Sequence, residues 1–228
     1  NIEALSKHFR VIAPDWAGFG KTDKMFSFDS AYAYRVDHIT EFLHVLGIRR
    51  AHFMGNSMGG TVLLSTIARK DCPWLVEKAV IISGGGDVPE NEARDILNSY
   101  DGSRDHMKRI VEVMFKNPAV YKDEAYIDRR HELSRLPGAW ECTAAARFKA
   151  PWRERSAFGP PKPDYSGISC PVLLVTGARD PLRAPGFGPK LQQDVPGSQL
   201  HVFDQAGHCP HIDEAEAFNE IATKFLLA

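Results

Sequence analysis

Residues 51–60 read AHFMGNSMGG, and this stretch places Ser57 between glycines at the end of an apolar run. The apolar residues before the serine are typical of a buried strand, and residues 61–69 (TVLLSTIAR) are typical of a helix. A serine on a sharp turn from strand to helix has a strained backbone, and small neighbours make room for that turn. The stretch therefore predicts that Ser57 projects from the carboxyl edge of a sheet as a candidate nucleophile.

Short β-type runs alternate with longer helical runs along most of the chain. This alternation predicts the α/β fold class, with a mostly parallel sheet flanked by helices. The expected strands are Arg10–Pro14, Ala51–Met54, Ala79–Ser83, Val172–Thr176 and Gln199–Phe203. The expected helices are residues 30–46, 58–69, 185–194 and 213–227.

The strand pattern is missing from residues 87–163, which contain mixed helical runs instead. The stretch ends at FGPPKP (158–163), a stiff connection rich in proline, and a strand pattern follows it. We expect residues 87–163 to form a helical cap inserted between two parts of an α/β core, residues 1–86 and 164–228. The alternative is that these helices pack on the sheet as ordinary crossover connections.

Composition excludes several classes of function. The chain has 228 residues and a formal net charge of -1, which gives no electrostatic case for binding nucleic acid or an anionic membrane. No apolar run approaches the roughly 18 residues of a membrane span. The 4 cysteines form no CxxC pair, which is typical of reduced thiols rather than of a zinc site. We expect a cytoplasmic protein.

A serine nucleophile needs a base, and a histidine oriented by a carboxylate is the usual one. Asp180 follows the expected strand Val172–Thr176, and His208 follows the expected strand Gln199–Phe203. Because the carboxyl ends of parallel strands meet at one edge, both residues should lie beside Ser57. The chain order Ser, Asp, His is also the order expected for a triad on this type of sheet. We expect Ser57, Asp180 and His208 to form a catalytic triad.

Other interpretations of these residues stay open. Ser57 can instead cap the helix that follows it. Asp87 follows another expected strand through three glycines, which is a second place for a triad acid. His201 and His211 are the alternatives to His208 as the base.

The expected reaction develops negative charge on a substrate oxygen. The backbone N–H of Met58, at the amino terminus of a helix, is the expected oxyanion donor. This chemistry needs no metal and no organic cofactor. The expected partner is a small-molecule substrate, and the sequence leaves open whether the protein is a homo-oligomer.

The motifs resemble the α/β-hydrolase superfamily over nearly the whole chain. PDWAGFGKTD (14–23) is similar to a loop that follows an early strand in that superfamily. Three further stretches resemble the carbon–carbon bond hydrolases that act on ring meta-cleavage products in aromatic catabolism: GNSMGG (55–60), RRHELSRLPGAWE (129–141) and GARDPLRAPG (177–186).

This resemblance implies a serine hydrolase that cleaves a carbon–carbon bond in a 2-hydroxy-6-oxo-dienoate type of substrate. It also implies that Asn56 and Arg129, with Arg130 as a nearby substitute, contact the dienoate end of that substrate. Cys209 stands where these hydrolases often have tryptophan, so the resemblance implies a roomier pocket beside His208.

The superfamily pattern also includes a second oxyanion donor on a loop after an earlier strand. That strand would lie between Arg10–Pro14 and Ala51–Met54 in the sheet, and no such motif precedes Arg10. We therefore expect N-terminal strands of the domain to be missing from this sequence.

Three rival functions remain at this point. One is a carboxylesterase of the same fold, and another is a non-catalytic relative that only binds a ligand. The third is nucleotide binding, because DWAGFGKT (15–22) looks like a phosphate-binding loop. Asp15 stands at the first glycine position of that motif, where its carboxylate would repel a phosphate.

Overall fold

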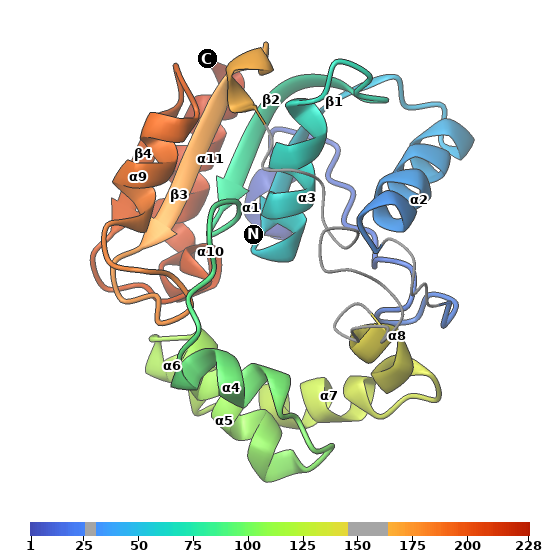
Figure 1. Ribbon diagram of the computed structural model, residues 1–228, viewed down its shortest axis with the longest axis vertical. Coiled ribbons are helices and arrows are strands. Elements are labelled where there is room, and N and C mark those ends of the chain that lie inside the picture. The colour runs from blue at the N-terminus through green and yellow to red at the C-terminus, as the bar shows by residue number, and fades with distance from the viewer. Residues whose placement is uncertain (26–30, 146–163) are drawn as a thin grey trace.

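A computed structural model describes residues 1–25, 31–145 and 164–228 of the chain (Figure 1). The described residues form one parallel sheet of four strands in the order β1-β2-β3-β4. The strands are β1 (Arg50–Asn56), β2 (Leu75–Ile82), β3 (Val172–Gly177) and β4 (Gln199–Phe203). The helices of the core are α1 (Ile2–Leu5), α2 (Ala31–Val45), α3 (Met58–Ile67), α9 (Phe187–Asp194), α10 (Pro210–Asp213) and α11 (Ala215–Leu227), with a 3-10 turn at Tyr165–Gly167.

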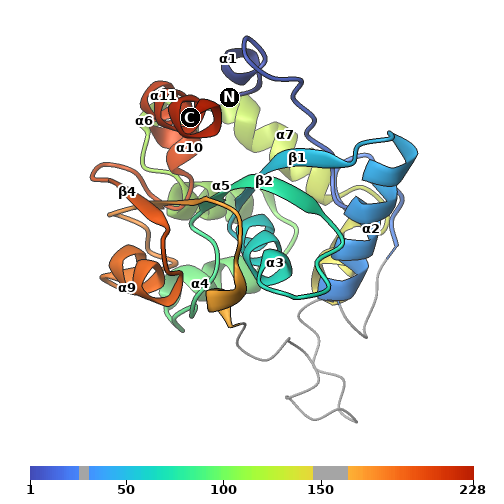
Figure 2. The same ribbon diagram turned by 90° about the horizontal axis from the view of Figure 1, so that it is seen from above.

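Both faces of the sheet are covered, which explains the continuous apolar run at the end of β2. Ile81 and Leu174 pack on one face against residues of α3 and α9. Ile82 and Val175 point to the opposite face and pack against α11. Figure 2 shows α11 on one side of the strands and α3 and α9 on the other. The α/β class predicted from the alternating pattern is confirmed.

The expected strand Arg10–Pro14 is wrong. Residues 10–14 form neither strand nor helix, and all of them except Val11 are exposed. β2 is the strand that pairs with β1, and among the described residues no ladder joins residues 10–14 to the sheet. An isolated segment with β-type residues has no backbone partners and gains no packing surface, so its propensity alone does not make it a strand. The expectation of missing N-terminal strands stays a prediction.

The other expected elements occur with small shifts at their ends. β1 and β2 are longer than expected, and β4 has the expected bounds. The helix expected over 213–227 is divided into α10 and α11 at Glu214. The first residue of the helix expected over 30–46 lies outside the described residues.

Five helices lie between β2 and β3 in the part of the expected cap that the structure describes, residues 87–145. They are α4 (Glu92–Asn98), α5 (Arg104–Met114), α6 (Pro118–Tyr121), α7 (Glu124–Ser134) and α8 (Ala139–Ala145). At the start of each of the first four helices, the side chain of the N-cap residue accepts a backbone N–H of the first turn. Each such cap stabilises the helix by about 1 kcal/mol. These side chains are Asn91, Ser103, Asn117 and Asp123. The expected cap residues 146–163 lie outside the described residues.

The position of these helices defines where a site can form. Figure 1 shows α4 to α7 beyond the carboxyl ends of β2 and β3, on the side toward which the strand arrows point. The turn at Ser57 and the loops after β3 and β4 lie at this edge. In residues 1–25, 31–145 and 164–228 no helix combines the length and the apolar character needed to cross a membrane.

Candidate active site

Ser57 occupies a strained turn between β1 and α3. Its backbone has φ 52 and ψ -112, a combination that residues with a side chain rarely adopt. The turn is held from both sides, because the Ser57 N–H donates to the Ile82 carbonyl at 2.7 Å and the Ser57 carbonyl accepts from the Thr61 N–H at 2.8 Å. The strand-turn-helix geometry predicted from residues 51–60 is therefore present.

Glycines let the backbone fold closely behind this turn. A Cβ at Gly55 would lie 2.5 Å from the carbonyl carbon of Gly59, and a Cβ at Gly60 would lie 2.7 Å from the Gly55 carbonyl oxygen. A Cβ at Gly59 would meet nothing within 4 Å. The steric demand for glycine therefore falls on Gly55 and Gly60 and not on Gly59.

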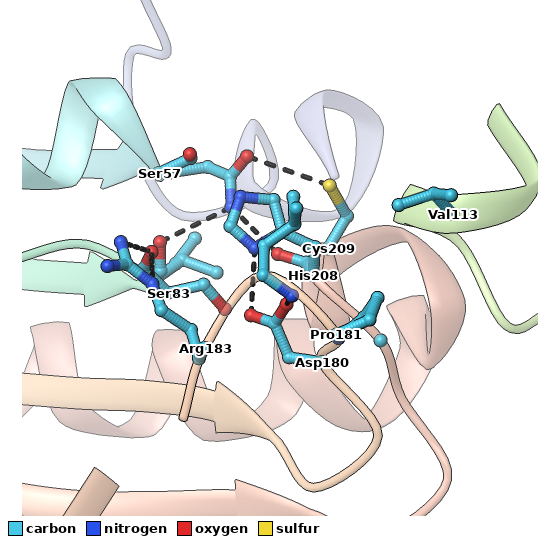
Figure 3. A network of polar contacts seen from close by, with 12 residues as sticks. Ser57, Ser83, Val113, Asp180, Pro181, Arg183, His208 and Cys209 are labelled. Carbon is cyan, nitrogen blue, oxygen red and sulfur yellow. Dashed lines mark hydrogen bonds and ion pairs between the residues drawn. The ribbon is translucent and has the colours of Figure 1, made fainter. Parts of the chain in front are cut away.

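His208 and Asp180 form a buried pair. His208 Nδ1 lies 2.8 Å from Asp180 Oδ2, and the side chains are 3% and 2% exposed. The second Asp180 oxygen accepts the Leu182 N–H at 2.8 Å, which fixes the carboxylate plane. A carboxylate only accepts, so the histidine donates through Nδ1, and Nε2 is the ring nitrogen left for another partner. Figure 3 draws Ser57 and Asp180 on opposite sides of the His208 ring.

Polar contacts of Asn56 join the turn at Ser57 to the loop after β4 that carries His208, here called the histidine loop. Asn56 Nδ2 donates to the His208 carbonyl at 3.2 Å and to the Ile82 carbonyl at 3.3 Å. Only the amino end of the amide can make both bonds, so Oδ1 faces the Cys209 thiol, which donates to it at 3.6 Å. Ser57 Oγ makes no hydrogen bond to another described residue. The Asn56 amide thus binds protein groups in this state.

The rival acid and bases lie elsewhere. Asp87 is exposed, and its carboxylate lies 3.5 Å from Lys190 Nζ. His201 is in β4 against Phe203. His211 packs on Phe218. Of the candidates from the sequence, the structure brings Asp180 and His208 into contact.

The Met58 backbone N–H lies in the first turn of α3, where helix amides have no partner within the helix. It makes no hydrogen bond to another described residue. The group is therefore available to a negative oxygen beside Ser57.

A comparison with known proteins identifies the fold. The sequence profile described as "Alpha/beta hydrolase family" matches residues 2–221. The chain belongs to the alpha/beta hydrolase family. A 2-hydroxymuconate semialdehyde hydrolase from Pseudomonas sp. strain CF600 is 31% identical over 97% of this chain and 78% of its own length. A 2-hydroxy-6-oxo-2,4-heptadienoate hydrolase from Pseudomonas putida is 30% identical over 98% of this chain and 80% of its own length.

Solved structures agree with this family. The meta-cleavage product hydrolase CumD from Pseudomonas fluorescens IP01 superposes with a TM-score of 0.84 at 27% identity, over 99% of this chain and 82% of that chain. This alpha/beta hydrolase thus resembles meta-cleavage product hydrolases at about the 30% identity level. The superfamily resemblance inferred from the motifs is confirmed.

Two neighbouring arginines in α7 of this alpha/beta hydrolase differ in exposure. Arg129 is exposed, whereas Arg130 is half-buried, and both guanidinium groups lie over the Tyr126 ring, at 5.6 and 5.7 Å. Burial raises the pKa of the Cys209 thiol to about 12, and the charge of Arg130 is close enough to oppose that rise. Arg130 Nε is buried without a hydrogen-bond partner among the described residues. Arg130, not Arg129, is therefore the arginine near the histidine loop.

Sequence reasoning assigned no role to Arg183, although it lies in the quoted stretch GARDPLRAPG. The side chain is buried and donates to the carbonyls of Ser83 at 3.1 Å and of Gly85 at 3.0 Å. It also lies over the Phe187 ring at 4.5 Å. Figure 3 shows Arg183 reaching Ser83. Within residues 1–25, 31–145 and 164–228, Ser57 and Ser83 are the non-glycine residues with a positive φ. No local pattern around Arg183 signals these contacts, because its partners are about 100 positions away.

Proposed function

We propose that this protein is a serine hydrolase that cleaves a carbon–carbon bond in a ring-cleavage product of the 2-hydroxy-6-oxo-dienoate type. The observation that carries the proposal is the buried His208–Asp180 pair, 2.8 Å apart, beside a strained serine turn. Relatives named as hydrolases of such dienoates, at about 30% identity over almost the full chain, support the choice of substrate class.

In this proposal Ser57 is the nucleophile. His208 takes the hydroxyl proton as Oγ attacks the substrate carbonyl carbon, and Asp180 holds the ring in the correct tautomer and stabilises the imidazolium. The Met58 N–H stabilises the oxyanion of the tetrahedral intermediate. The intermediate collapses to an acyl-enzyme as the substrate carbon–carbon bond breaks, and the proton held by His208 passes to the departing dienoate fragment. Water, deprotonated by His208, then hydrolyses the acyl-enzyme and releases a carboxylic acid and Ser57. The resemblance to carbon–carbon hydrolases further implies that the dienol becomes its keto tautomer before this attack.

We assign the substrate carboxylate to Arg130. Its half-buried guanidinium lies near Cys209, the residue after the proposed base, and its Nε has an unused donor among the described residues. A guanidinium binds a carboxylate through two parallel hydrogen bonds. For Asn56 to contact the substrate as well, its amide would have to leave the His208 and Ile82 carbonyls.

The proposed substrate pocket therefore lies between the carboxyl edge of the sheet and the cap. Cys209 is buried there, in one apolar cluster with cap residues such as Val111 and Phe115. We propose that the cap, residues 87–163, selects the substrate, and that the enzyme acts in the cytoplasm on a small molecule without a metal or organic cofactor.

The first test is the loss of the yellow absorbance of a 2-hydroxy-6-oxo-dienoate, with Ser57→Ala beside the unchanged protein. We expect bleaching that falls by at least about a thousandfold in Ser57→Ala. If the dienoate is stable but a p-nitrophenyl ester is cleaved in a Ser57-dependent manner, the protein is a carboxylesterase. If neither compound reacts, the serine hydrolase proposal is wrong.

The second test separates the two neighbouring arginines. Arg130→Met should raise KM for the dienoate about 10- to 100-fold while leaving cleavage of a neutral ester within about twofold, because only the dienoate carries a carboxylate. Arg129→Met is the matched control, with the same chemistry one residue away on the exposed side. Equal effects of the two substitutions would refute the assignment to Arg130.

A further inference from the structure

Asp213, at the end of α10, has a carboxylate that binds backbone N–H groups of a nearby loop and of a segment far away in the sequence. Oδ2 accepts the Gly207 N–H at 2.8 Å, in the loop just before His208. Oδ1 accepts the N–H groups of Lys116 and Asn117, both at 3.0 Å, at the junction of α5 and α6. The residue is 8% exposed, so this carboxylate is stabilised by fixed amide groups rather than by water.

Other bonds connect the same two segments. The His208 N–H donates to the Met114 carbonyl at 2.9 Å, and Asn117 Nδ2 donates to the Asp213 carbonyl at 3.0 Å. A Cβ at Gly207 would lie 2.9 Å from the Met114 carbonyl oxygen, so the close approach requires glycine. The last turn of α5 is thus hydrogen-bonded directly to the histidine loop.

Apolar contacts also join the histidine loop and α10 to α5 and α7. Cys209 belongs to the hydrophobic cluster formed by α5 and α7, and Ile212 packs against it. Phe115 and Ile127 of that cluster are fully buried. The hydrophobic core of helices α4–α7, here called the helical insert, therefore includes residues beside His208. A shift of α5 would change the surroundings of His208.

We propose that Asp213 is a positioning residue for the reaction, which holds the His208 loop against the α5–α6 junction so that the imidazole keeps its geometry toward Ser57. This inference rests on the proposed function, in which His208 is the general base. The physical argument is that an aspartate offers acceptors in two directions at once. The isosteric asparagine has one acceptor and one donor, so one side of the junction would be left with an unpaired buried N–H.

The test is Asp213→Asn, measured on the dienoate and on a p-nitrophenyl ester at a temperature where circular dichroism shows the protein folded. We expect kcat to fall about 10- to 100-fold on both compounds, because small displacements of a catalytic group have effects of that size. KM should stay within about threefold, because Asp213 does not line the proposed carboxylate site.

Val195→Ala is the control for stability alone. Val195 is 1% exposed in the core cluster that contains α3 and Leu191, away from the α5–α6 junction. It should lower the melting temperature of the protein while its kcat stays within about twofold. An Asp213→Asn variant that lowers only the melting temperature, like Val195→Ala, would overturn the inference.

Ser57→Ala separates the two proposals. If Ser57→Ala is inactive while Asp213→Asn keeps full kcat, the positioning role fails and the hydrolase mechanism stands. If Ser57→Ala keeps its activity, the mechanism itself is wrong, and the positioning role of Asp213 falls with it.

Discussion

At the scale of single residues, the backbone at Ser57 is stable only because its neighbours remove steric conflicts. The φ of 52 orients the hydroxyl out of the sheet edge, and the bare Cα of Gly55 lets the start of α3 approach β1. Strain of this kind costs on the order of 1–3 kcal/mol, which the surrounding hydrogen bonds must offset. The sequence pattern G-x-S-x-G does not distinguish its two glycines, but the structure does.

We therefore predict that alanine destabilises the protein at Gly55 but not at Gly59. Gly55→Ala should lower the free energy of unfolding by about 1–3 kcal/mol, because the new Cβ meets backbone atoms of Gly59 and Gly60 at 2.5–2.6 Å. Gly59→Ala is the control and should be neutral or stabilising by up to about 1 kcal/mol, because it adds a good helix former in open space. Urea unfolding of both variants checks this, and similar values for the two would contradict it.

The lowered pKa of His211 predicts that the free energy of unfolding depends on pH. Burial, followed by the proximity of His208, lowers the pKa of His211 from 6.5 to about 4. As the pH falls below about 6.5, the unfolded chain binds the proton first, so the free energy of unfolding decreases until the pH reaches about 4. Between pH 7.5 and 4.5 this group should account for about 2–3 kcal/mol of lost stability. His211→Gln should lose that much less over the same range in urea unfolding, and an unchanged slope would contradict the prediction.

At the scale of elements, two loops are held by buried charged side chains that bind backbone. Arg183 connects the turn after β3 to the carbonyls after β2, and Asp213 connects the loop after β4 to the end of α5. Burial lowers the pKa of Arg183 and the charge of Asp180 opposes that change, so the guanidinium stays protonated at neutral pH. Loops at the carboxyl edge are thus fixed by charge-assisted hydrogen bonds rather than by apolar packing alone.

Arg183→Met should lower the free energy of unfolding by about 2–4 kcal/mol, because it leaves the Ser83 and Gly85 carbonyls without their donor. Lys190→Met is a matched control for the loss of a cation that faces the same segment after β2, because Lys190 in α9 lies beside Asp87. Its ammonium lies 3.5 Å from the exposed Asp87 carboxylate, and such surface pairs contribute less than about 1 kcal/mol. Urea unfolding measures both, and an equally small loss in Arg183→Met would show that the carbonyls find other donors.

At the scale of the whole molecule, the helical insert (α4–α7) packs directly against the loop and helix that follow β4. The cluster around Phe115 contains Cys209, and the α5–α6 junction is hydrogen-bonded to Gly207 and His208. We predict that residues 104–117 and 207–213 open together, because cooperative units follow such shared contacts. Hydrogen exchange with mass spectrometry should give similar protection in the two segments, and Asp213→Asn should lower both. Rapid exchange of residues 104–117 beside a protected histidine loop would contradict this.

Much of the architecture was predictable because its signals are local. The apolar runs identify the four strands that the structure describes, and the helix that follows Ser57 starts at the expected residue. The contact between Asp180 and His208 was also predictable, since two parallel strands bring the residues after them to one edge. The strand expected at Arg10–Pro14 failed because a strand is defined by its neighbour, and β propensity contains no information about the neighbour.

The sequence by itself determined the strand-turn-helix at Ser57, the α/β class and the chain order of the proposed triad. Each expected strand or helix depends on residue types within a few positions, and the order of these elements is read directly along the chain. Only the tertiary structure decided which arginine lies near the histidine loop, which glycine is sterically required, and that Asp213 and Arg183 bind distant backbone. The contacts of Arg183 and Asp213 join segments about 100 positions apart, and the two glycines of the serine motif look alike until the backbone is folded around them. Burial and contact arise only when the chain has folded, so a sequence pattern cannot specify them.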